Sequence, residues 1–560
     1  MTTTLTNLNK FKDIPWVIDT ETTGLQVIGN PGKHTAKWIG LKPAIDDAIV
    51  HVVSISEFNR DLREIVTKDI SLVGHNIRFD LHALNLDPEQ PLWDTMSFAY
   101  YSNTTARKSL DFLAKMRGWP KIETPEELKR GKIDSMNPEV LAEYLADDVD
   151  ITYRLYKEQA EAGSNLISNI KKDFELERAL KKIQSRGVLL LRDKMSEIQE
   201  RVLGAAKIVE VDIRKLGYDG SLSSPMQLGN WLAANGRHLP TTKTGAFSTS
   251  KEVINNLIEK GDAFAEKLLE WRKLTKLNQA FLVPLPELAQ EDRWREGFFL
   301  YPQVNTTRTA TGRFSYDKPN LQQIPKGRDN ALGKEIRKCL THEGGVSVAD
   351  YSQVELRIAA ALSGEPTLLE AFAAGGDPHG ETAAKVFGKP FKDVTPVERH
   401  AAKTVNFGIL FGAGPNRLAT ELRISLEEAR KIFYDWKRGL SKMANWCEQM
   451  WANCEHGQYA TTVAGRRRVF GGDESTRPGL SVIVQGSAAE IMRASLIAAE
   501  NAGLEPILSV HDEIIVRGQG KEKELAEVMQ ESAENAFKKY FSAVSFPADG
   551  SSGETWGETD

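Results

Sequence analysis

Four acidic residues near the amino terminus have the types and spacing of a site for divalent cations. Asp19 and Glu21 lie two residues apart in "VIDTETTGL", a predicted strand, so both carboxylates point to the same face. Asp80 and Asp148 lie in two segments with helical patterns, "VGHNIRFDLHAL" and "EYLADDVDITY". Carboxylates that converge from a strand and two helices could hold two cations about 3.5 to 4 Å apart and support phosphodiester hydrolysis by an activated water.

Two polar residues accompany the helical acids at a spacing of four. Asn76 precedes Asp80 and Tyr144 precedes Asp148, so each pair lies on one side of its helix. The Tyr144 hydroxyl could orient the attacking water, although a tyrosine that is simply part of the core fits the same pattern. Each segment alone has an ordinary structural explanation, and only the combination indicates a nuclease site.

A second set of candidate residues lies after residue 300. "GGVSVADYSQVELRIAAALSG" predicts a strand that ends at Asp350 and a helix that starts near Gln353, with Glu355 in its first turns. "ILSVHDEIIVRG" predicts a hairpin with His511 and Asp512 at or beside its turn. Asp350 and Asp512 could together hold two Mg²⁺ ions, which phosphoryl transfer needs to neutralise developing charge.

A stripe of cations and aromatic rings is predicted between these two segments. "PVERHAAKTVNFGILFGAG" repeats such residues every four positions, and each step drifts only about 40° around a helix. The members of this stripe are Arg399, Lys403, Phe407 and Phe411. Cations suit a triphosphate and rings suit a base and sugar, although an amphipathic helix with a basic end would look the same. His379 in "GGDPHGETAAKVFG" could add a phosphate contact.

The elements that must position these residues divide the chain into several units. A chain of 560 residues is too long for one hydrophobic core. Its patterns predict an α/β unit with strands at 14–19 and 49–55, then an elongated helical unit, then a sheet unit with a mostly helical insertion. The patterns place the helical unit at about 166–290 and the helical insertion at about 364–500, with the sheet unit after residue 290.

The overall composition narrows the function classes. A formal net charge of −5 excludes a globally basic nucleic-acid binder, so phosphate contacts must come from local patches. We expect no membrane-spanning window and no secretory signal, which predicts a cytoplasmic protein. The three cysteines (Cys339, Cys447 and Cys454) form no C-x-x-C pair, so neither disulfides nor a zinc site is predicted.

The first acidic set resembles the three motifs of the DEDD-type 3′→5′ exonucleases, in the subclass whose third motif carries a tyrosine. That resemblance implies an RNase H-like domain in which Tyr144 positions the nucleophile. The implied ligands of two divalent ions are Asp19, Glu21, Asp80 and Asp148. It also implies DNA contacts by Asn76 and by Leu25, the latter as a wedge against the terminal base.

The later segments "DYSQVELR", "RHAAKTVNFGILFG" and "VHDE" resemble motifs A, B and C of the family A (DNA polymerase I-like) DNA polymerases. "TRTATGRFSYDKPNLQQIP" resembles the segment that contacts primer and template, and "GRRR" with "VQGSAAEI" the region leading into the template-contacting helix. With "SPMQL" and "FSTSKEVI", the similarity covers essentially the whole chain. It implies a multidomain α/β and α+β chain, with an exonuclease domain (1–165), thumb (166–290), palm (291–363 and 475–560) and fingers (364–474).

The polymerase resemblance also implies roles for individual residues. Asp350 and Asp512 bind both metals, Tyr351 adds a backbone carbonyl, Glu513 is a supporting acid, and Lys403 is a candidate general acid to pyrophosphate. The implied dNTP contacts are Tyr351, Gln353, Glu355 as the block against a ribose 2′-hydroxyl, His379, Arg399, Lys403, Phe407 as the stacking ring, and Phe411. The implied DNA contacts are Arg308, Arg313, Asn320, Gln322, Arg466, Arg467, Gln485 and His511.

Some positions depart from the family pattern. Phe411 stands where bacterial enzymes usually have Tyr, so a hydroxyl that could anchor Glu355 is missing. Ser481 replaces a usual Asn at a template-side position, and Phe407 in place of Tyr implies discrimination against dideoxynucleotides. Only 18 residues precede Asp19, so we expect no 5′ nuclease domain and a short build like that of a phage replicative enzyme.

The resemblances imply a DNA-templated DNA polymerase with 3′→5′ proofreading. It would be a monomer that uses primer-template DNA, dNTPs and two Mg²⁺ ions at each site, with Mn²⁺ as a substitute. A helicase or primase, or a single-strand-binding protein, is a candidate partner. An exonuclease whose second half only holds DNA would require loss of Asp350, Lys403 or Asp512, and a non-catalytic clamp would require both acidic sets to be broken. Both sets are intact.

Overall fold

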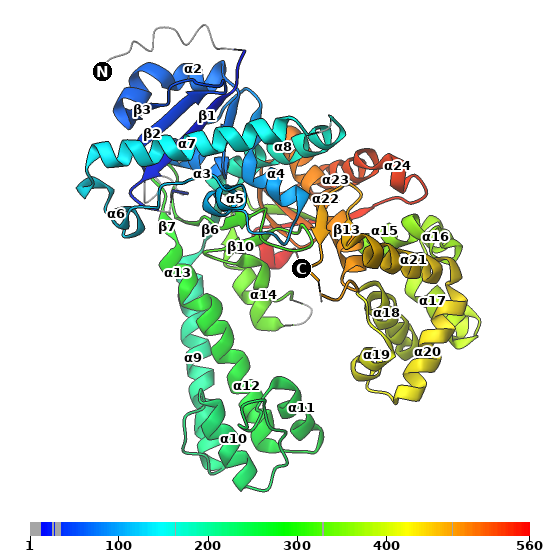
Figure 1. The fold of residues 1–560 in the computed structure, drawn as a ribbon. Helices are drawn as coiled ribbons and strands as arrows, with labels where there is room; N and C mark the ends of the chain where they lie inside the picture. Colours follow the sequence, from blue (N-terminus) through cyan, green and yellow to red (C-terminus); the bar gives the residue numbers. More distant parts are fainter. Residues whose placement is uncertain are drawn as a thin grey trace.

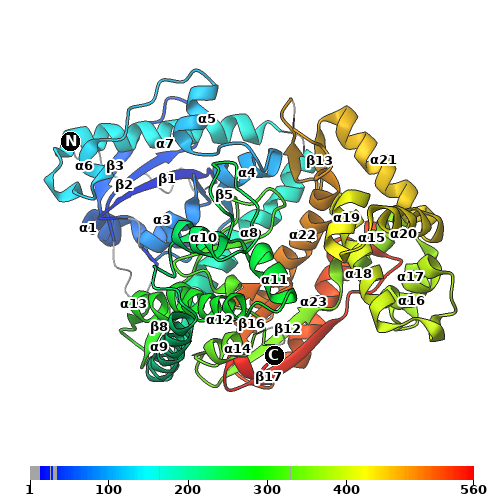
Figure 2. The same cartoon turned by 90° about the horizontal axis from the view of Figure 1, so that it is seen from below.

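The computed structural model describes residues 13–24, 27–28, 35–162, 164–327, 330–472 and 474–559. Figure 1 shows an amino-terminal unit, a long helical arm and a second group of helices that extend from a common centre. The view from below places the strands β12, β16 and β17 in that centre, apart from the sheet of the amino-terminal unit (Figure 2).

The amino-terminal unit is built on a five-stranded sheet with the order β3-β2-β1-β4-β5. Its strands are β1 (Trp16–Thr22), β2 (Ala36–Pro43), β3 (His51–Ser54), β4 (Leu72–Gly74) and β5 (Leu92–Asp94). The first three pair antiparallel, whereas β4 and β5 run parallel to β1. The predicted strands at 14–19 and 49–55 correspond to β1 and β3. The strand β2, "AKWIGLKP", was missed because Lys, Gly and Pro interrupt its apolar pattern.

Helices cover this sheet and begin at recognisable signals. The helix α7 (Pro138–Ala160) has Asn137 as its N-cap and Pro138 at its first position. It lies so close to β2 that a Cβ on Gly40 would be 2.7 Å from a methyl of Val149. The other helices of this unit are α1 (Ile55–Glu57), α2 (Arg63–Lys68), α3 (Ile77–Ala83), α4 (Thr95–Ser102), α5 (Leu110–Met116) and α6 (Glu126–Lys129).

The helical arm has an apolar core of its own, which includes Ile213, Leu228, Ile254 and Phe264. Its helices are α9 (Arg192–Lys215), α10 (Pro225–Ala234), α11 (Lys251–Glu259) and α12 (Ala263–Leu277). The expected boundary at 165/166 falls inside α8 (Ser164–Arg186), and α8 packs against β5, β15 and α22. The arm therefore begins after α8, with α9.

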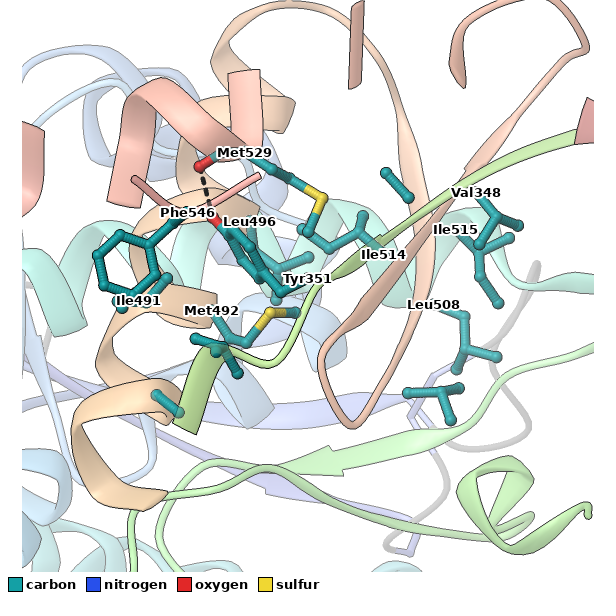
Figure 3. Close-up of a cluster of buried hydrophobic side chains, with 14 of the residues drawn as sticks. Val348, Tyr351, Ile491, Met492, Leu496, Leu508, Ile514, Ile515, Met529 and Phe546 are labelled. Atoms are coloured by element: carbon teal, nitrogen blue, oxygen red, sulfur yellow. Dashed lines mark hydrogen bonds between the residues drawn. The ribbon is translucent and has the colours of Figure 1, made fainter. Parts of the chain in front are cut away.

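The central sheet is antiparallel and has the order β15-β16-β12-β17. Its strands are β12 (Val346–Tyr351), β15 (Pro506–Val510), β16 (Glu513–Arg517) and β17 (Ala548–Gly553). Figure 3 shows Tyr351 and Ile514 on the side of Leu496 and Met529, whereas Val348 lies on the opposite side. Both faces are therefore buried, with α22 (Gly479–Asn501) and α23 (Glu522–Ala536) on the Tyr351 side.

Short strands connect the arm to this centre. One small sheet contains β6 (Val188–Leu190), β7 (Gln290–Glu291), β8 (Phe298–Leu300) and β11 (Leu340–Thr341). The strands β9 (Gln303–Asn305) and β10 (Ser315–Asp317) form a hairpin beside it. The segment "FFLYPQV" contains all of β8 and the first two residues of β9.

The helical insertion packs around buried polar contacts as well as apolar ones. Its helices are α16 (Pro366–Ala373), α17 (Pro378–Phe387), α18 (Pro396–Leu410), α19 (Pro415–Leu422), α20 (Leu426–Gly439) and α21 (Ser441–Gly457). The indole of Trp436 donates to the fully buried Asn406 side chain at 2.7 Å, which ties α20 to α18. The hairpin of β13 (Tyr459–Thr461) and β14 (Arg467–Val469) follows, and the three cysteines are buried without a disulfide.

Among the described helices, α22 alone is long and apolar enough to cross a membrane, with a mean hydropathy of 1.3. The expectation of no such window was wrong for this segment. Because 72% of the window is buried inside the protein, α22 has the surroundings of a core helix.

A cluster of buried charges joins the amino-terminal unit to the centre. Arg466 is 1% exposed and donates to Asp173 of α8 at 2.7 Å and to Glu490 of α22 at 2.8 Å. Arg493 of α22 also pairs with Asp173, at 3.3 Å. Four charges taken out of water are tolerated only because each has a partner of opposite sign.

We predict that Arg466→Met lowers the free energy of unfolding by about 3 to 5 kcal/mol, because Glu490 loses its partner inside the protein. Urea unfolding followed by tryptophan fluorescence measures the change. The matched control is Arg467→Met, since Arg467 lies on the same hairpin with an exposed side chain. Equal stability of the two variants would contradict the assigned role of the cluster.

Candidate active sites

The first acidic set forms a cluster at one end of the amino-terminal sheet. Asp19 and Glu21 of β1 and Asp148 of α7 each offer a carboxylate oxygen, and these oxygens lie within 4.8 Å of one another. Asp80 of α3 is buried beside them and accepts a hydrogen bond from Thr20 Oγ1 at 2.6 Å. The two-residue alternation of β1 and the helical spacing of the motifs therefore bring together the predicted carboxylates.

The electrostatics of this cluster fit a divalent cation. Burial, together with Asp80 and Asp148, holds the pKa of Asp19 well above its usual range. Burial and the charge of Asp148 raise the pKa of Glu21 to about 8, and burial raises the pKa of Asp80 to about 7. These carboxylates repel one another when they are ionised, and carboxylate oxygens are ligands that Mg²⁺ and Mn²⁺ prefer. A bound divalent cation would therefore stabilise the ionised cluster.

Tyr144 and Lys121 complete the cluster on the side of α7. The Tyr144 hydroxyl is 3.3 Å from Thr124 Oγ1 and lies one helical turn before Asp148. Lys121 Nζ is 2.5 Å from an Asp148 oxygen and 4.8 Å from the centre of the Tyr144 ring. Lys121 was not predicted as a site residue, because it lies in a loop whose sequence has no helical or strand periodicity that would connect it with Asp148.

The predicted DNA contacts of this site lie in different surroundings. Asn76 has a left-handed backbone, with φ of 68°, directly before α3. Its side chain lines a cavity of about 110 Å³, which Phe79 and Gln303 also border. Leu25 lies outside the described residues.

The second acidic set lies at the end of the central sheet. Asp350 is the penultimate residue of β12, and Asp512 lies in the predicted turn between β15 and β16. The backbone N–H of Tyr351 donates to the carbonyl of Asp512 at 3.1 Å, which fixes the turn against the strand end. Burial raises the pKa of Asp512, Arg313 opposes the rise, and the nearby charge of Asp350 adds to it.

The third acid, Glu513, is directed into the protein. It is 4% exposed and accepts a hydrogen bond from the Trp556 indole at 2.8 Å. Lys326 Nζ lies 2.8 Å from Asp350 and 3.5 Å from Glu513. Lys326, like Lys121, was not predicted as a site residue. Glu513 therefore fits a supporting role better than a ligand role.

The residues expected beside the sugar lie on and before α15 (Val354–Ser363). Glu355 forms an ion pair with Arg313, and burial raises the pKa of Glu355 to about 7 while Arg313 opposes the rise. Gln353 has a left-handed backbone at the N-cap. The Tyr351 hydroxyl is 2.8 Å from Ser495 Oγ within the core, so only its main chain is left for a ligand.

The stripe of cations and rings lies on α18 as predicted, with Phe411 as the C-cap residue. The rings of Phe407 and Phe411 stack with centroids 6.0 Å apart. Arg399 pairs with Asp377 at 2.9 Å, and Lys403 is exposed. His379 is 3% exposed with its Nδ1 3.3 Å from the Asn406 amide, so a phosphate contact by His379 would require α18 to move.

Family models match nearly the whole chain. Residues 192–558 match DNA polymerase family A, and residues 2–161 match a 3′-5′ exonuclease. The chain belongs to DNA polymerase family A. The expected fold class, an exonuclease domain followed by a polymerase, is confirmed.

Individual relatives agree with the family models. DNA polymerase I of Borreliella burgdorferi is 28% identical over 97% of this chain and 62% of its own length. The thermostable DNA polymerase I of Thermus aquaticus is 35% identical over 68% of this chain and 48% of its own length. This chain thus spans 62% of the length of the first relative and just under half of the length of the second.

A solved structure has the same fold. The POL domain of Pol1 from M. smegmatis, in complex with DNA primer-template and dNTP, has a TM-score of 0.83 and 23% identity. The likeness covers 99% of this chain and 97% of that one.

Several predicted DNA contacts of this family A polymerase are engaged within the protein. Arg466 was predicted wrongly, because its guanidinium is buried against Asp173 and Glu490 and cannot reach DNA. Arg308 pairs with Asp317, and the Asn320 side chain accepts from the Gln322 N–H at 3.1 Å.

Other predicted DNA contacts remain accessible beside the polymerase acids. Gln322, Arg313 and His511 border a small cavity next to Asp512. Arg467 is exposed and lies 4.4 Å over the Tyr459 ring, and Gln485 is half-buried on α22.

We predict that the polymerase loses stability with rising pH when divalent ions are removed by EDTA. Because burial raises the pKa of Glu21 to about 8, the folded protein keeps a proton that the unfolded chain releases above 4.5. The free energy of unfolding should therefore fall between about pH 5 and about pH 8. Glu21→Gln should weaken this dependence, as urea titrations across the range would measure.

The control for this prediction is Glu64→Gln, since the Glu64 side chain is 79% exposed in the same unit. It should keep the wild-type dependence. Saturating Mn²⁺ should flatten the dependence of the wild type, because a bound cation requires the ionised carboxylates. The same pH dependence in Glu21→Gln and wild type would contradict the prediction.

Proposed function

We propose that the chain is a DNA-templated DNA polymerase that extends a primer 3′ end with dNTPs and removes mismatched 3′ ends at a second site. The observation that carries this proposal is the presence of two separate acidic sites, one on β1 and α7 and one at the turn of β15 and β16 beside β12. Each lies within the segment that matches the corresponding family model.

At the polymerase site, Asp350, Asp512 and the Tyr351 carbonyl would hold two Mg²⁺ ions. When bound, the ions would neutralise the charge on the reacting phosphate. The exposed Lys403 can reach a triphosphate and donate a proton to the departing pyrophosphate. Arg399 would exchange its pairing with Asp377 for the triphosphate, whose oxygens can accept two hydrogen bonds from the guanidinium and carry more negative charge than one carboxylate.

The aromatic residues of the same site would orient the nucleotide. Phe407 presents a half-exposed ring at the end of the cationic stripe, where a base can stack on it. Glu355 occupies the sugar side, and its ion pair with Arg313 holds the carboxylate in place without a hydroxyl on Phe411. The Glu355 carboxylate would then occupy the space that a ribose 2′-hydroxyl needs.

At the exonuclease site, Asp19, Glu21, Asp80 and Asp148 would hold two divalent ions. The Tyr144 hydroxyl would orient the attacking water, because the hydroxyl and the Asp148 carboxylate lie on one face of α7. Asn76 would contact the terminal nucleotide from the N-cap of α3, beside the buried Asp80.

The biological setting is part of the proposal. The preferred ion is Mg²⁺ with Mn²⁺ as a substitute. The proposed division is exonuclease, thumb, palm and fingers, with the thumb beginning at α9 rather than at residue 166. Replication of phage DNA, a cytoplasmic location, a monomeric state and a helicase, primase or single-strand-binding partner stay predictions. The relatives described above are bacterial DNA polymerases I.

We predict reciprocal losses of activity when one acid is removed from each site. Asp512→Ala should reduce dNTP incorporation at least about a thousandfold, since several kcal/mol of charge stabilisation depend on the metal. It should leave degradation of single-stranded DNA within about twofold. Asp19→Ala should do the reverse, as primer extension and 3′-end release on the same labelled primers would show.

The two variants test the two site assignments separately. Persistent incorporation by Asp512→Ala would reject the assignment of the polymerase metal site, and undiminished removal of a mismatched 3′ end by Asp19→Ala would reject the exonuclease site. Asp549→Ala is the matched control for Asp512, because Asp549 pairs with Asp350 across the β12–β17 ladder without belonging to the proposed machinery.

We predict that Glu355→Ala increases ribonucleotide incorporation relative to dNTP incorporation. The shortened side chain leaves room for a 2′-hydroxyl, and a steric block of this size corresponds to about 10- to 200-fold in discrimination. Single-nucleotide insertion kinetics with matched dNTP and rNTP measure the ratio. No gain over wild type would count against Glu355 as the sugar block.

A further inference from the structure

Lys121 is a buried lysine inside the exonuclease unit. Its side chain is 8% exposed, although lysines usually keep the ammonium group in water. Two acids from different elements account for the burial: Nζ lies 2.5 Å from Asp148 of α7 and 3.1 Å from Asp111 of α5. The loop between α5 and α6 is thus held to the acidic cluster by one ammonium group.

The same ammonium contacts a second residue of the proposed site. It lies 4.8 Å from the centre of the Tyr144 ring, a distance at which a cation and an aromatic face attract each other. Tyr144 and Asp148 are one helical turn apart, so Lys121 touches both side chains that α7 contributes to the site.

Lys121 is also a source of positive charge for acids on the facing strand. Its charge opposes the repulsion that raises the pKa values of Asp19 and Glu21. The site therefore contains four carboxylates and one resident cation from the protein itself.

We propose that Lys121 is a positioning residue of the exonuclease reaction, which holds the Asp148 carboxylate and the Tyr144 ring in the arrangement that the chemistry uses. This inference rests on the proposed exonuclease function. If Asp148 binds a divalent ion, Asp111 keeps the ammonium group paired, since its carboxylate also lies 3.1 Å from Nζ. Lys121 can therefore stay beside Tyr144 while Asp148 changes partner.

The role has two measurable consequences. Removing the ammonium group should let the side chains of Asp148 and Tyr144 move out of position. Mutation of a residue that orients the ligands of a metal site typically lowers activity about 10- to 100-fold. Removing a positive charge should also make the remaining carboxylates bind a cation more tightly. A lysine that only supports the fold would produce neither the second effect nor a loss confined to one activity.

The test compares Lys121→Met and Lys121→Arg with wild type as the full chain. Exonuclease kcat and KM on single-stranded DNA are measured across a Mn²⁺ series, and Mn²⁺ binding is measured by calorimetry without DNA. We expect Lys121→Met to lower kcat about 10- to 100-fold with KM within about threefold, and to bind Mn²⁺ more tightly. Lys121→Arg should recover part of kcat, and dNTP incorporation should be unchanged in both variants.

The matched control is Lys37→Met, because Lys37 is a half-exposed lysine of the same unit that pairs with the surface residue Asp134. It should behave as wild type in every assay. An unchanged kcat in Lys121→Met, a loss that saturating Mn²⁺ restores, or an equal loss of dNTP incorporation would overturn the inference.

Wild type and Asp148→Ala are assayed in parallel, so that failure of the proposed exonuclease function can be distinguished from failure of the proposed role of Lys121. Absence of exonuclease activity in wild type would reject the proposed function itself. Activity in wild type that Asp148→Ala abolishes and Lys121→Met leaves intact would reject only the role of Lys121.

Discussion

The ion pairs of Arg466 with Asp173 and Glu490 are the constraint on which the arrangement of the two halves depends. They join α8, α22 and the β13–β14 hairpin at a place from which water is excluded. Arg493 in the same cluster donates to main-chain carbonyls of Thr306 and Gly312, in the segment that carries the predicted DNA contacts. The exonuclease unit donates to that segment as well, through the side chains of Tyr100 in α4 and of Thr104 just after that helix. Apolar side chains could fill this space but could not donate hydrogen bonds to these buried carbonyls.

Both acidic sites use the end of a strand to present carboxylates that burial makes costly. In the exonuclease unit the strand is β1, and in the polymerase centre it is β12 with the turn beside it. Each site also contains a lysine from a loop, Lys121 in the first and Lys326 in the second, which partly offsets the acidic charge. Burying several acids together disfavours their ionised forms, and the positive charge of these lysines partly offsets that cost.

Much of the site was predictable because its signals are local. The period of two in β1, the spacing of four in α7 and the turn within "ILSVHDEIIVRG" each depend on nearby residues alone. The parts that sequence reasoning missed depend on distant partners. Arg466 looks like a surface cation, since Asp173 lies 293 residues away. Lys121 carries no periodic signal, and the buried Lys42 of β2 finds its partners, Asp150 and the Tyr153 ring, more than 100 residues away.

The most direct test of two independent metal sites is an anomalous scattering map from crystals grown with Mn²⁺, primer-template DNA and a non-hydrolysable dNTP analogue. The account predicts peaks at two places: among Asp19, Glu21, Asp80 and Asp148, and between Asp350 and Asp512. Each should vanish only when an acid of its own set is replaced. Peaks confined to one set, or a polymerase-site peak bound to Glu513 rather than Asp512, would contradict it.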